Sequence, residues 1–216
     1  MTFSPRDDLS DTYSVTFPSG KLPNDVLDGL LLKHTGSADP RLIVGPGVGE
    51  DAAVIAFGET CLVAKTDPVT FATDQLGWYA VHVNANDIAA MGATPKWFLS
   101  TIIVPQQMAT TALFEQILGQ IQMACASLNV AIAGGHTEIT TGIDRPFVIG
   151  QMLGEVKTDR VIRSSGLKPG DVLLLTKSIA IEATSIIARE MTQTLRARGW
   201  TENEMVEAAD YLTRPG

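Results

Sequence analysis

Apolar residues at helical spacing mark three segments of the chain as expected helices. Leucines and valines recur every three or four residues after Pro23, and Gly36 can close the segment, which predicts a helix over about 23–34. Two longer segments, at 76–91 and 109–128, follow the same spacing. The first of these is apolar or small on every side, so we expect it to be largely buried.

Short apolar runs bounded by turn residues predict strands between these helices. Gly58-Glu59-Thr60 joins two of the runs and indicates a β-hairpin. Strands and helices alternate, yet the hairpin requires an antiparallel pair, so the sequence predicts an α+β fold with helices on one face of a mixed sheet. The predicted strands cover 42–44, 52–57, 61–66, 96–104, 130–133 and 147–156.

A run of charged residues followed by Ser, Gly and Pro near 157–170 predicts a domain boundary. After it, the pattern predicts one strand at 172–176 and helices at about 181–198 and 202–212. One strand and two helices would struggle to form a core of their own, so we expect this second α/β domain to be cut short. The predicted organisation is a mobile N-terminal segment at 1–19, a first domain at 20–157 and the beginning of a second domain at 158–216.

Composition narrows the class of protein. The chain has 216 residues, of which 45% are hydrophobic, so it can bury a core and is not disordered. Its 24 acidic residues against 16 Lys and Arg give a net charge of −8, which disfavours nucleic acid as a partner. No apolar stretch is long enough to span a membrane and the first 17 residues lack a signal peptide's apolar region, so we expect a cytoplasmic protein. Cys61 and Cys125 lie in apolar runs and are expected to be reduced core thiols.

Acidic residues stand at the ends of predicted elements instead of on solvated helix faces. Glu50 and Asp51 follow a glycine-rich segment and precede a strand, Asp67 ends the next strand, and Glu138 follows a pair of glycines. Asp87 lies within the apolar helix, where an unpaired charge would cost several kcal/mol.

Two kinds of partner can compensate a buried Asp87. One is an ion pair, for which Lys65 and Lys96 are the near candidates in sequence. The other is Mg²⁺, which prefers hard oxygen ligands and shares them with polyphosphate oxygens. Asn84 lies three residues before Asp87 on the same helix face and can support the metal.

Two glycine-rich segments lie beside these acidic residues. Gly47 and Gly49 belong to the first, and Gly134-Gly135-His136-Thr137, which we place at the end of a strand, forms the second. Glycine allows either a tight turn or a close approach of backbone N–H groups to phosphate, and neither segment has the Walker pattern. Together they indicate a nucleotide. His136 is the histidine that we expect to be functional, whereas His82 fits a hydrogen-bonded core residue equally well.

Taken in order, these motifs resemble the aminoimidazole ribonucleotide synthetase (PurM-like) superfamily, which includes selenophosphate synthetase, thiamine-monophosphate kinase and the hydrogenase-maturation protein HypE. The resemblance implies an ATP- and Mg²⁺-dependent enzyme that forms a homodimer through strands of its N-terminal domain. The matching segments are 49–54, 65–67, 83–93, 134–137 and 167–172.

The same resemblance assigns roles to individual residues. It implies that the carboxylates hold metal and that the glycines and their neighbours contact ATP. The implied metal ligands are Glu50, Asp51, Asp67 and Asp87. The implied ATP and phosphate contacts are Gly47, Gly49, Lys65, Asn84, Gly134, Gly135, His136 and Thr137.

HypE-related proteins are the most similar subgroup, on the segment 20–23 and the run through Trp97-Phe98. This implies ATP-driven dehydration of a carbamoyl group, with a maturation partner protein. The alternatives are a small-molecule kinase of the thiamine-monophosphate type and a non-catalytic nucleotide-binding dimeric module. His136 stands where kinase-type members carry Asp, which weakens the thiamine-monophosphate kinase interpretation, and the His-Thr form is more similar to selenophosphate synthetase.

Overall fold

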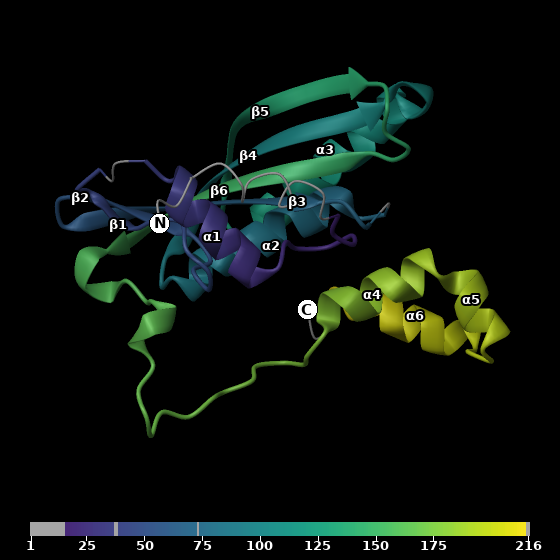
Figure 1. The fold of residues 1–216 in the computed structure, drawn as a ribbon. Helices are drawn as coiled ribbons and strands as arrows, with labels where there is room; N and C mark the ends of the chain where they lie inside the picture. Colours follow the sequence, from purple (N-terminus) through teal and green to yellow (C-terminus); the bar gives the residue numbers. More distant parts are fainter. Residues whose placement is uncertain (1–15, 37–38, 73, 215–216) are drawn as a thin grey trace, which may run out of the picture.

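Six strands form one mixed sheet in the computed structural model, which describes residues 16–36, 39–72 and 74–214 (Figure 1). The strand order is β1-β2-β3-β6-β4-β5. Only the β4–β5 pair is parallel; the other four pairs are antiparallel. The strands are β1 (Leu42–Val44), β2 (Ala53–Phe57), β3 (Thr60–Val69), β4 (Thr94–Pro105), β5 (Ala131–Thr140) and β6 (Phe147–Lys157). The predicted mixed sheet and the hairpin between β2 and β3 are confirmed.

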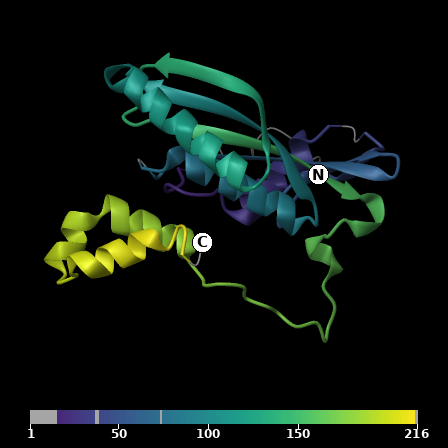
Figure 2. The same ribbon diagram turned by 180° about the vertical axis from the view of Figure 1, so that it is seen from behind.

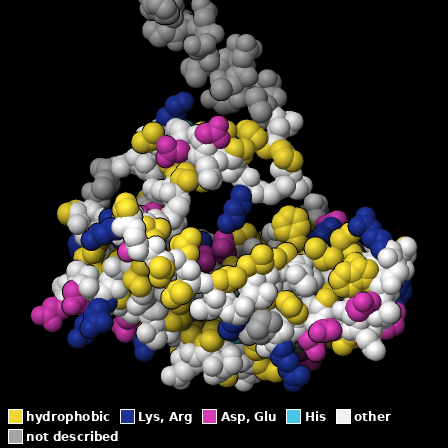
Figure 3. Space-filling view, turned by 90° about the horizontal axis from the view of Figure 1, so that it is seen from below, with side chains coloured by type: hydrophobic (Ala, Val, Ile, Leu, Met, Phe, Trp, Pro, Cys, Tyr) yellow, Lys and Arg dark blue, Asp and Glu magenta, His cyan; other side chains and the backbone are white. Residues whose placement is uncertain are grey.

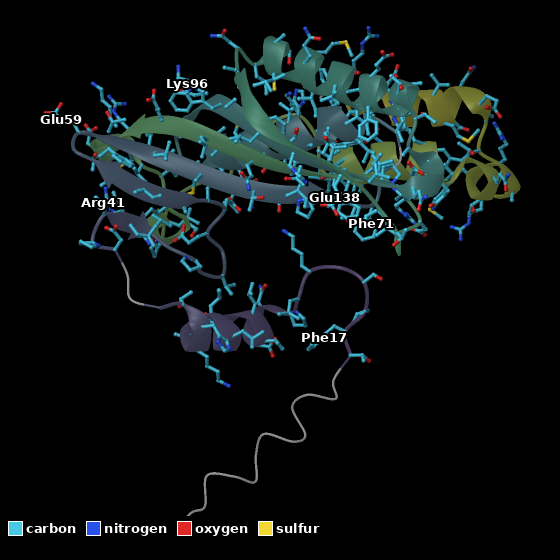
Figure 4. The ribbon with its side chains drawn as sticks, turned by 90° about the horizontal axis from the view of Figure 1, so that it is seen from above. Phe17, Arg41, Glu59, Phe71, Lys96 and Glu138 are labelled. Atoms are coloured by element: carbon cyan, nitrogen blue, oxygen red, sulfur yellow. The ribbon has the colours of Figure 1, made fainter. Side chains whose placement is uncertain are left out.

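Two long helices cover one face of this sheet (Figures 1 and 2). They are α2 (Leu76–Ala90) and α3 (Thr111–Ser127), and both were predicted within two residues at each end. The core lies between them and the sheet, where alternate residues of β4 and β6 are buried together with apolar residues of both helices. The third predicted helix, α1 (Asn24–His34), lies beyond the opposite face, and all its side chains keep some exposure (Figure 4).

Small residues in β6 allow α2 to lie directly on the sheet. A Cβ atom at Gly150 would collide with the side-chain amide of Asn84 and would lie 2.8 Å from the carbonyl oxygen of Ala80. Farther along the strand, a Cβ atom at Gly154 would collide with Ile88. The two glycines therefore fix how closely the polar residues of α2 approach the strands.

The predicted strand at 130–133 is too short. The strand β5 continues through the paired glycines to Thr140, so Gly134 and His136 lie inside a strand rather than in a loop at its end. Pairing with β4 explains the difference, because nine residue pairs in register extend the ladder past the glycines despite a shift between Phe98 and Leu99. All residues of β5 except Thr140 are exposed, and β5 is one of the two edge strands of the sheet.

The segment after β6 contains helices but no strand among the residues that the structure describes. The strand predicted at 172–176 is wrong, because this segment is exposed and pairs with no other strand there. The helix predicted at 181–198 is broken at Met191 into α4 (Ile181–Glu190) and α5 (Thr192–Ala197), and α6 (Glu202–Asp210) follows. Short 3₁₀ turns lie at Gln106–Met108, Thr158–Arg160 and Ser164–Gly166.

The C-terminal helices contact the first domain through an ion pair. The Nη1 atom of Arg189 on α4 lies 2.7 Å from Oδ2 of Asp74, which precedes α2. Arg189 also donates to the carbonyl oxygen of Ala209 in the last turn of α6, at 3.2 Å, so one side chain joins three parts of the chain.

Three further expectations can be compared with the described residues. Residues 1–15 of the expected mobile segment lie outside them. Cys61 and Cys125 are buried and free, as predicted. Among the described helices, none combines the length and the apolar character that crossing a membrane requires.

Candidate functional site

The acidic residues predicted on β3 and α2 meet at one lysine. Lys65 and Asp67 lie two residues apart on β3, so their side chains leave the strand on the same face. The Nζ atom of Lys65 lies 2.7 Å from Oδ2 of Asp87 on α2 and 3.4 Å from Oδ2 of Asp67. The sequence offered two candidate ion-pair partners for Asp87, Lys65 and Lys96. The structure shows that Lys65 is the partner.

One lysine does not neutralise the negative charge of this cluster. Burial raises the pKa of Asp87, and the negative charges of Asp51 and Asp67 raise it further, so that together they outweigh the opposing effect of Lys65. Burial lowers the pKa of Lys65, but its hydrogen bond and attraction to Asp87 and Asp67 raise it above its usual value. The two shifts are consistent with Lys65 lying between Asp67 and Asp87 while the charge of Asp51 also acts on Asp87, so the carboxylates outnumber the ammonium group and a further cation would be favoured.

Glu50 lies at the entrance to β2 and is only partly paired. Its Oε1 atom accepts a hydrogen bond at 3.3 Å from Nη2 of Arg163, a residue that the sequence analysis did not select. Its Oε2 atom is buried and has no hydrogen-bond partner among the described residues. A buried carboxylate oxygen without a partner is costly unless a cation or a donor reaches it.

Asn84 connects α2 to the end of β3. Its side-chain amide donates to the carbonyl oxygen of Ala80 at 2.8 Å and to that of Asp67 at 3.3 Å. Its Oδ1 atom is buried without a partner in the described part of the chain. Asn84 thus fixes the backbone that carries Asp67 relative to the helix that carries Asp87.

The donor chemistry of this region fits Mg²⁺, although the ligands do not converge. Carboxylate oxygens are the protein ligands that Mg²⁺ prefers, and it usually takes only one or two of them together with water and phosphate oxygens. Within 16–36, 39–72 and 74–214, no three His, Cys, Asp or Glu side chains lie close enough together to hold an ion by themselves. The implied ligands Glu50, Asp51, Asp67 and Asp87 therefore fit a metal that is shared with a polyphosphate.

The glycine-rich segments lie at two different places relative to the carboxylates. Gly47 and Gly49 form the turn before β2, where the N–H group of Glu50 donates to the carbonyl oxygen of Gly47 at 3.3 Å. Gly49 has φ +88°, a left-handed conformation that favours glycine.

Gly135 lies at the same level of the sheet as Asp67, three strands away. The strand register pairs Asp67 of β3 with Gly150 of β6. It then pairs Gly150 with Ser100 of β4, and Ser100 with Gly135 of β5. Three strand spacings separate the two residues, a distance of about 14 Å.

His136, Thr137 and Glu138 occupy the exposed edge strand β5. The Nε2 atom of His136 lies 3.6 Å from Oε2 of Glu138, and both side chains are more than half exposed (Figure 4). The structure thus brings Lys65, Asp67, Asn84 and Asp87 together, and it places the glycine and histidine segment on a separate strand.

Sequence reasoning did not identify a cavity between α2 and the C-terminal helices. It has a volume of about 740 Å³. Its residues come from α2, the end of α3, the segment before α4, the first turn of α4 and the segment after α6, so no local motif could indicate it. The lining residues are Trp78, Tyr79, His82, Val83, Asn86, Leu128, Thr176, Lys177, Ile181, Glu182, Leu212 and Thr213.

On the face seen from below, Figure 3 shows acidic and basic side chains interspersed among hydrophobic ones.

Replacing Lys65 by methionine is expected to lower the free energy of unfolding at neutral pH by about 1–2 kcal/mol. Asp67 and Asp87 would lose their common cation, and the loss stays below that of a fully buried pair because both carboxylates keep some exposure. Urea denaturation measures the change. Lys96→Met is the matched control, because no ion pair of Lys96 is found among the described residues and it lies near the Glu59 end of the sheet (Figure 4). An equal loss in both variants would contradict the role of Lys65.

The sequence matches a known family over the region that carries this site. The profile described as "AIR synthase related protein, N-terminal domain" matches residues 49–156, which is half of the chain. A selenide, water dikinase of Dechloromonas aromatica (strain RCB) is 30% identical over 201 residues, covering 91% of this chain and 56% of that protein.

Two solved structures share the fold. AaThiL complexed with AMPPCP and TMP has a TM-score of 0.67 at 18% identity, covering 88% of this chain and 58% of its own. Hydrogenase maturation protein HypE in complex with ATP has a TM-score of 0.55 at 21% identity, covering 77% and 46%. This chain spans about half the length of the proteins that it matches.

Proposed function

This chain belongs to the AIR synthase related family, and from that membership we propose that it binds ATP with Mg²⁺ and transfers or activates a phosphoryl group. The observation that carries the proposal is the pair of carboxylates Asp67 and Asp87 on the ammonium group of Lys65, with the negative charge of Asp51 acting on Asp87. Structural neighbours bound to ATP and to AMPPCP support the nucleotide.

The proposed roles follow from the chemistry of each side chain. Asp51, Asp67 and Asp87, with the unpartnered Oε2 of Glu50, would hold Mg²⁺, which neutralises phosphate charge and aligns the transferred group. Lys65 would contact a phosphate oxygen, because its ammonium group already lies among the carboxylates that would bind the metal.

The remaining residues would position the nucleotide. The side chain of Asn84 holds the end of β3 in place, and the turn with Gly47 and Gly49 offers backbone N–H groups. The exposed glycines Gly134 and Gly135, with His136 and Thr137, would contact the far part of ATP along the edge strand β5.

We propose a HypE-like acceptor, so that phosphorylation drives dehydration of a carbamoyl group with the help of a maturation partner protein. The second candidate is a kinase that acts on a small molecule, which the 30% identity to a selenide, water dikinase and the fold shared with AaThiL favour. In either case we propose a cytoplasmic homodimer formed through the N-terminal domain, whose exposed edge strand β5 can pair with another copy.

Isothermal titration of the full chain with ATP tests the proposed function. We expect binding with Mg²⁺ to be at least about tenfold tighter than binding in excess EDTA, because the carboxylates repel ATP unless a cation lies between them. Equal affinity in both conditions would contradict the metal-dependent site. Phosphate release distinguishes an enzyme from a binding module, for which ATP would bind without turnover.

A further inference from the structure

The cavity beside α2 has the size and lining of a small-molecule site. Its volume of about 740 Å³ falls within the range of sites that enclose small ligands. Apolar side chains come from α2, α4 and the segment after α6, including Val83, Ile181 and Leu212. The polar side chains Lys177 and Glu182 line the side formed by the C-terminal segment. Such a lining suits a ligand with one apolar and one polar side.

His82 presents a hydrogen-bond acceptor in this cavity. Its Nδ1 atom lies 3.0 Å from the carbonyl oxygen of Trp78. A carbonyl oxygen only accepts, so Nδ1 must carry the proton and donate it. In a neutral ring the other nitrogen, Nε2, then has a free lone pair. No partner of Nε2 is found in the described part of the chain.

The surroundings of His82 keep its ring neutral. Burial lowers the pKa of His82 below its usual 6.5, the hydrogen bond to the backbone of Trp78 opposes this effect, and the positive charge of Lys177 lowers the pKa further. Besides Lys177, the cavity lining contains one charged residue, Glu182, and this residue is exposed. At neutral pH the Nε2 atom is therefore an acceptor, not a donor.

The rings of Trp78 and His82 are stacked, with centroids 4.2 Å apart and planes inclined by 25°. This contact and the Nδ1 hydrogen bond hold the imidazole in one orientation. Both residues lie on α2, whose packing against α3 and the sheet fixes them further. A preorganised acceptor beside flat aromatic surfaces is suited to a ring that carries a hydroxyl group.

We propose that this cavity binds a small alcohol with an aromatic ring, whose hydroxyl group donates to Nε2 of His82 while its ring packs against the apolar wall. The binding site itself does not depend on the proposed function. Only the identification of this alcohol as the phosphoryl acceptor rests on the proposed function, and there on the small-molecule kinase candidate instead of the HypE-like acceptor.

In that transfer, the alcohol oxygen would form the new bond to the γ-phosphorus of ATP. The bond from that phosphorus to the bridging oxygen breaks, and its electron pair stays on ADP. The hydroxyl proton passes to Nε2 of His82, and solvent later removes it.

The test uses benzyl alcohol as the probe and toluene as the matched probe without a hydroxyl group, both in the absence of nucleotide. In protein labelled with ¹⁵N-histidine, benzyl alcohol is expected to shift the Nε2 resonance of His82. Toluene, which offers no donor, should leave that resonance nearly unchanged. The exposed residues His34 and His136 serve as internal controls.

A second measurement uses His82→Phe, which keeps a ring beside Trp78 and removes the acceptor nitrogen. The affinity for benzyl alcohol should fall by about fivefold to tenfold, whereas the affinity for toluene should not fall. An unchanged Nε2 resonance, an equal shift with toluene, or equal binding by His82→Phe would each overturn the proposal. If benzyl alcohol binds as expected and ATP does not, the site is supported and the proposed function is the part that fails.

Discussion

Replacing Asp87 by asparagine is expected to weaken the binding of ATP in the presence of Mg²⁺ by about 100-fold or more, while the protein stays folded. Asparagine has the same shape but lacks the charge that a hard divalent cation requires of its ligand. The fold should tolerate the change, because burial and neighbouring carboxylates already disfavour the charged form of Asp87. Lys65 would still have Asp67 as a partner at 3.4 Å.

Calorimetric titration with ATP and Mg²⁺ measures the affinity, and thermal unfolding measures the stability of the same preparation. Asp28→Asn is the matched control, since Asp28 lies exposed on α1. The Asp28→Asn protein should bind ATP as the wild type does. Unchanged affinity in Asp87→Asn would remove Asp87 from the metal site. A large loss of stability would instead mean that Asp87 is a structural ion-pair residue.

The sequence predicts the sheet and its two covering helices well, because most of these elements are governed by local periodicity. The apolar spacing of α2 and α3 and the turn Gly58-Glu59 each fix an element without distant partners, and all three are confirmed. The strand β5 is different. Its glycines give a weak local signal, and it continues only because it pairs with β4.

Whereas β5 was predicted too short, the segment 172–176 was predicted as a strand and forms none in the structure. Its Val and Leu residues have high strand propensity, but a strand needs a neighbour for its N–H and C=O groups, and the described residues offer none. Propensity indicates that a segment can be a strand and does not supply its partner.

The candidate site was predictable as a set of residues but not as an arrangement. An aspartate in an apolar helix indicates that a cation lies near it, and Lys65 is that cation. The sequence could not indicate that Arg163 reaches Glu50 across 113 positions. The cavity at His82 depends likewise on segments that meet only in the folded chain.

Replacing Gly77 by alanine is expected to destabilise the protein by about 3 kcal/mol, which corresponds to a fall in Tm of about 6–12 °C. Gly77 lies where α2 crosses α3, and its N–H group donates to Oε1 of Gln120 at 3.0 Å. An added Cβ atom would collide with the backbone carbonyl of Ile117 and lie 2.9 Å from Cβ of Gln120. A backbone carbonyl cannot rotate away as a side chain can, so the two helices must separate.

Gly119→Ala on α3 is the matched control, because a Cβ atom there has no neighbour within 4 Å. It should stabilise the protein by about 0.5–1 kcal/mol, since alanine loses less backbone freedom in a helix than glycine does. Opposite signs for the same substitution on two packed helices would show that contact, and not helix propensity, decides the effect. Because α2 carries His82, Asn84 and Asp87, a folded Gly77→Ala protein should also bind Mg²⁺ and ATP more weakly. Retained stability in Gly77→Ala would mean that the helices are not packed this closely.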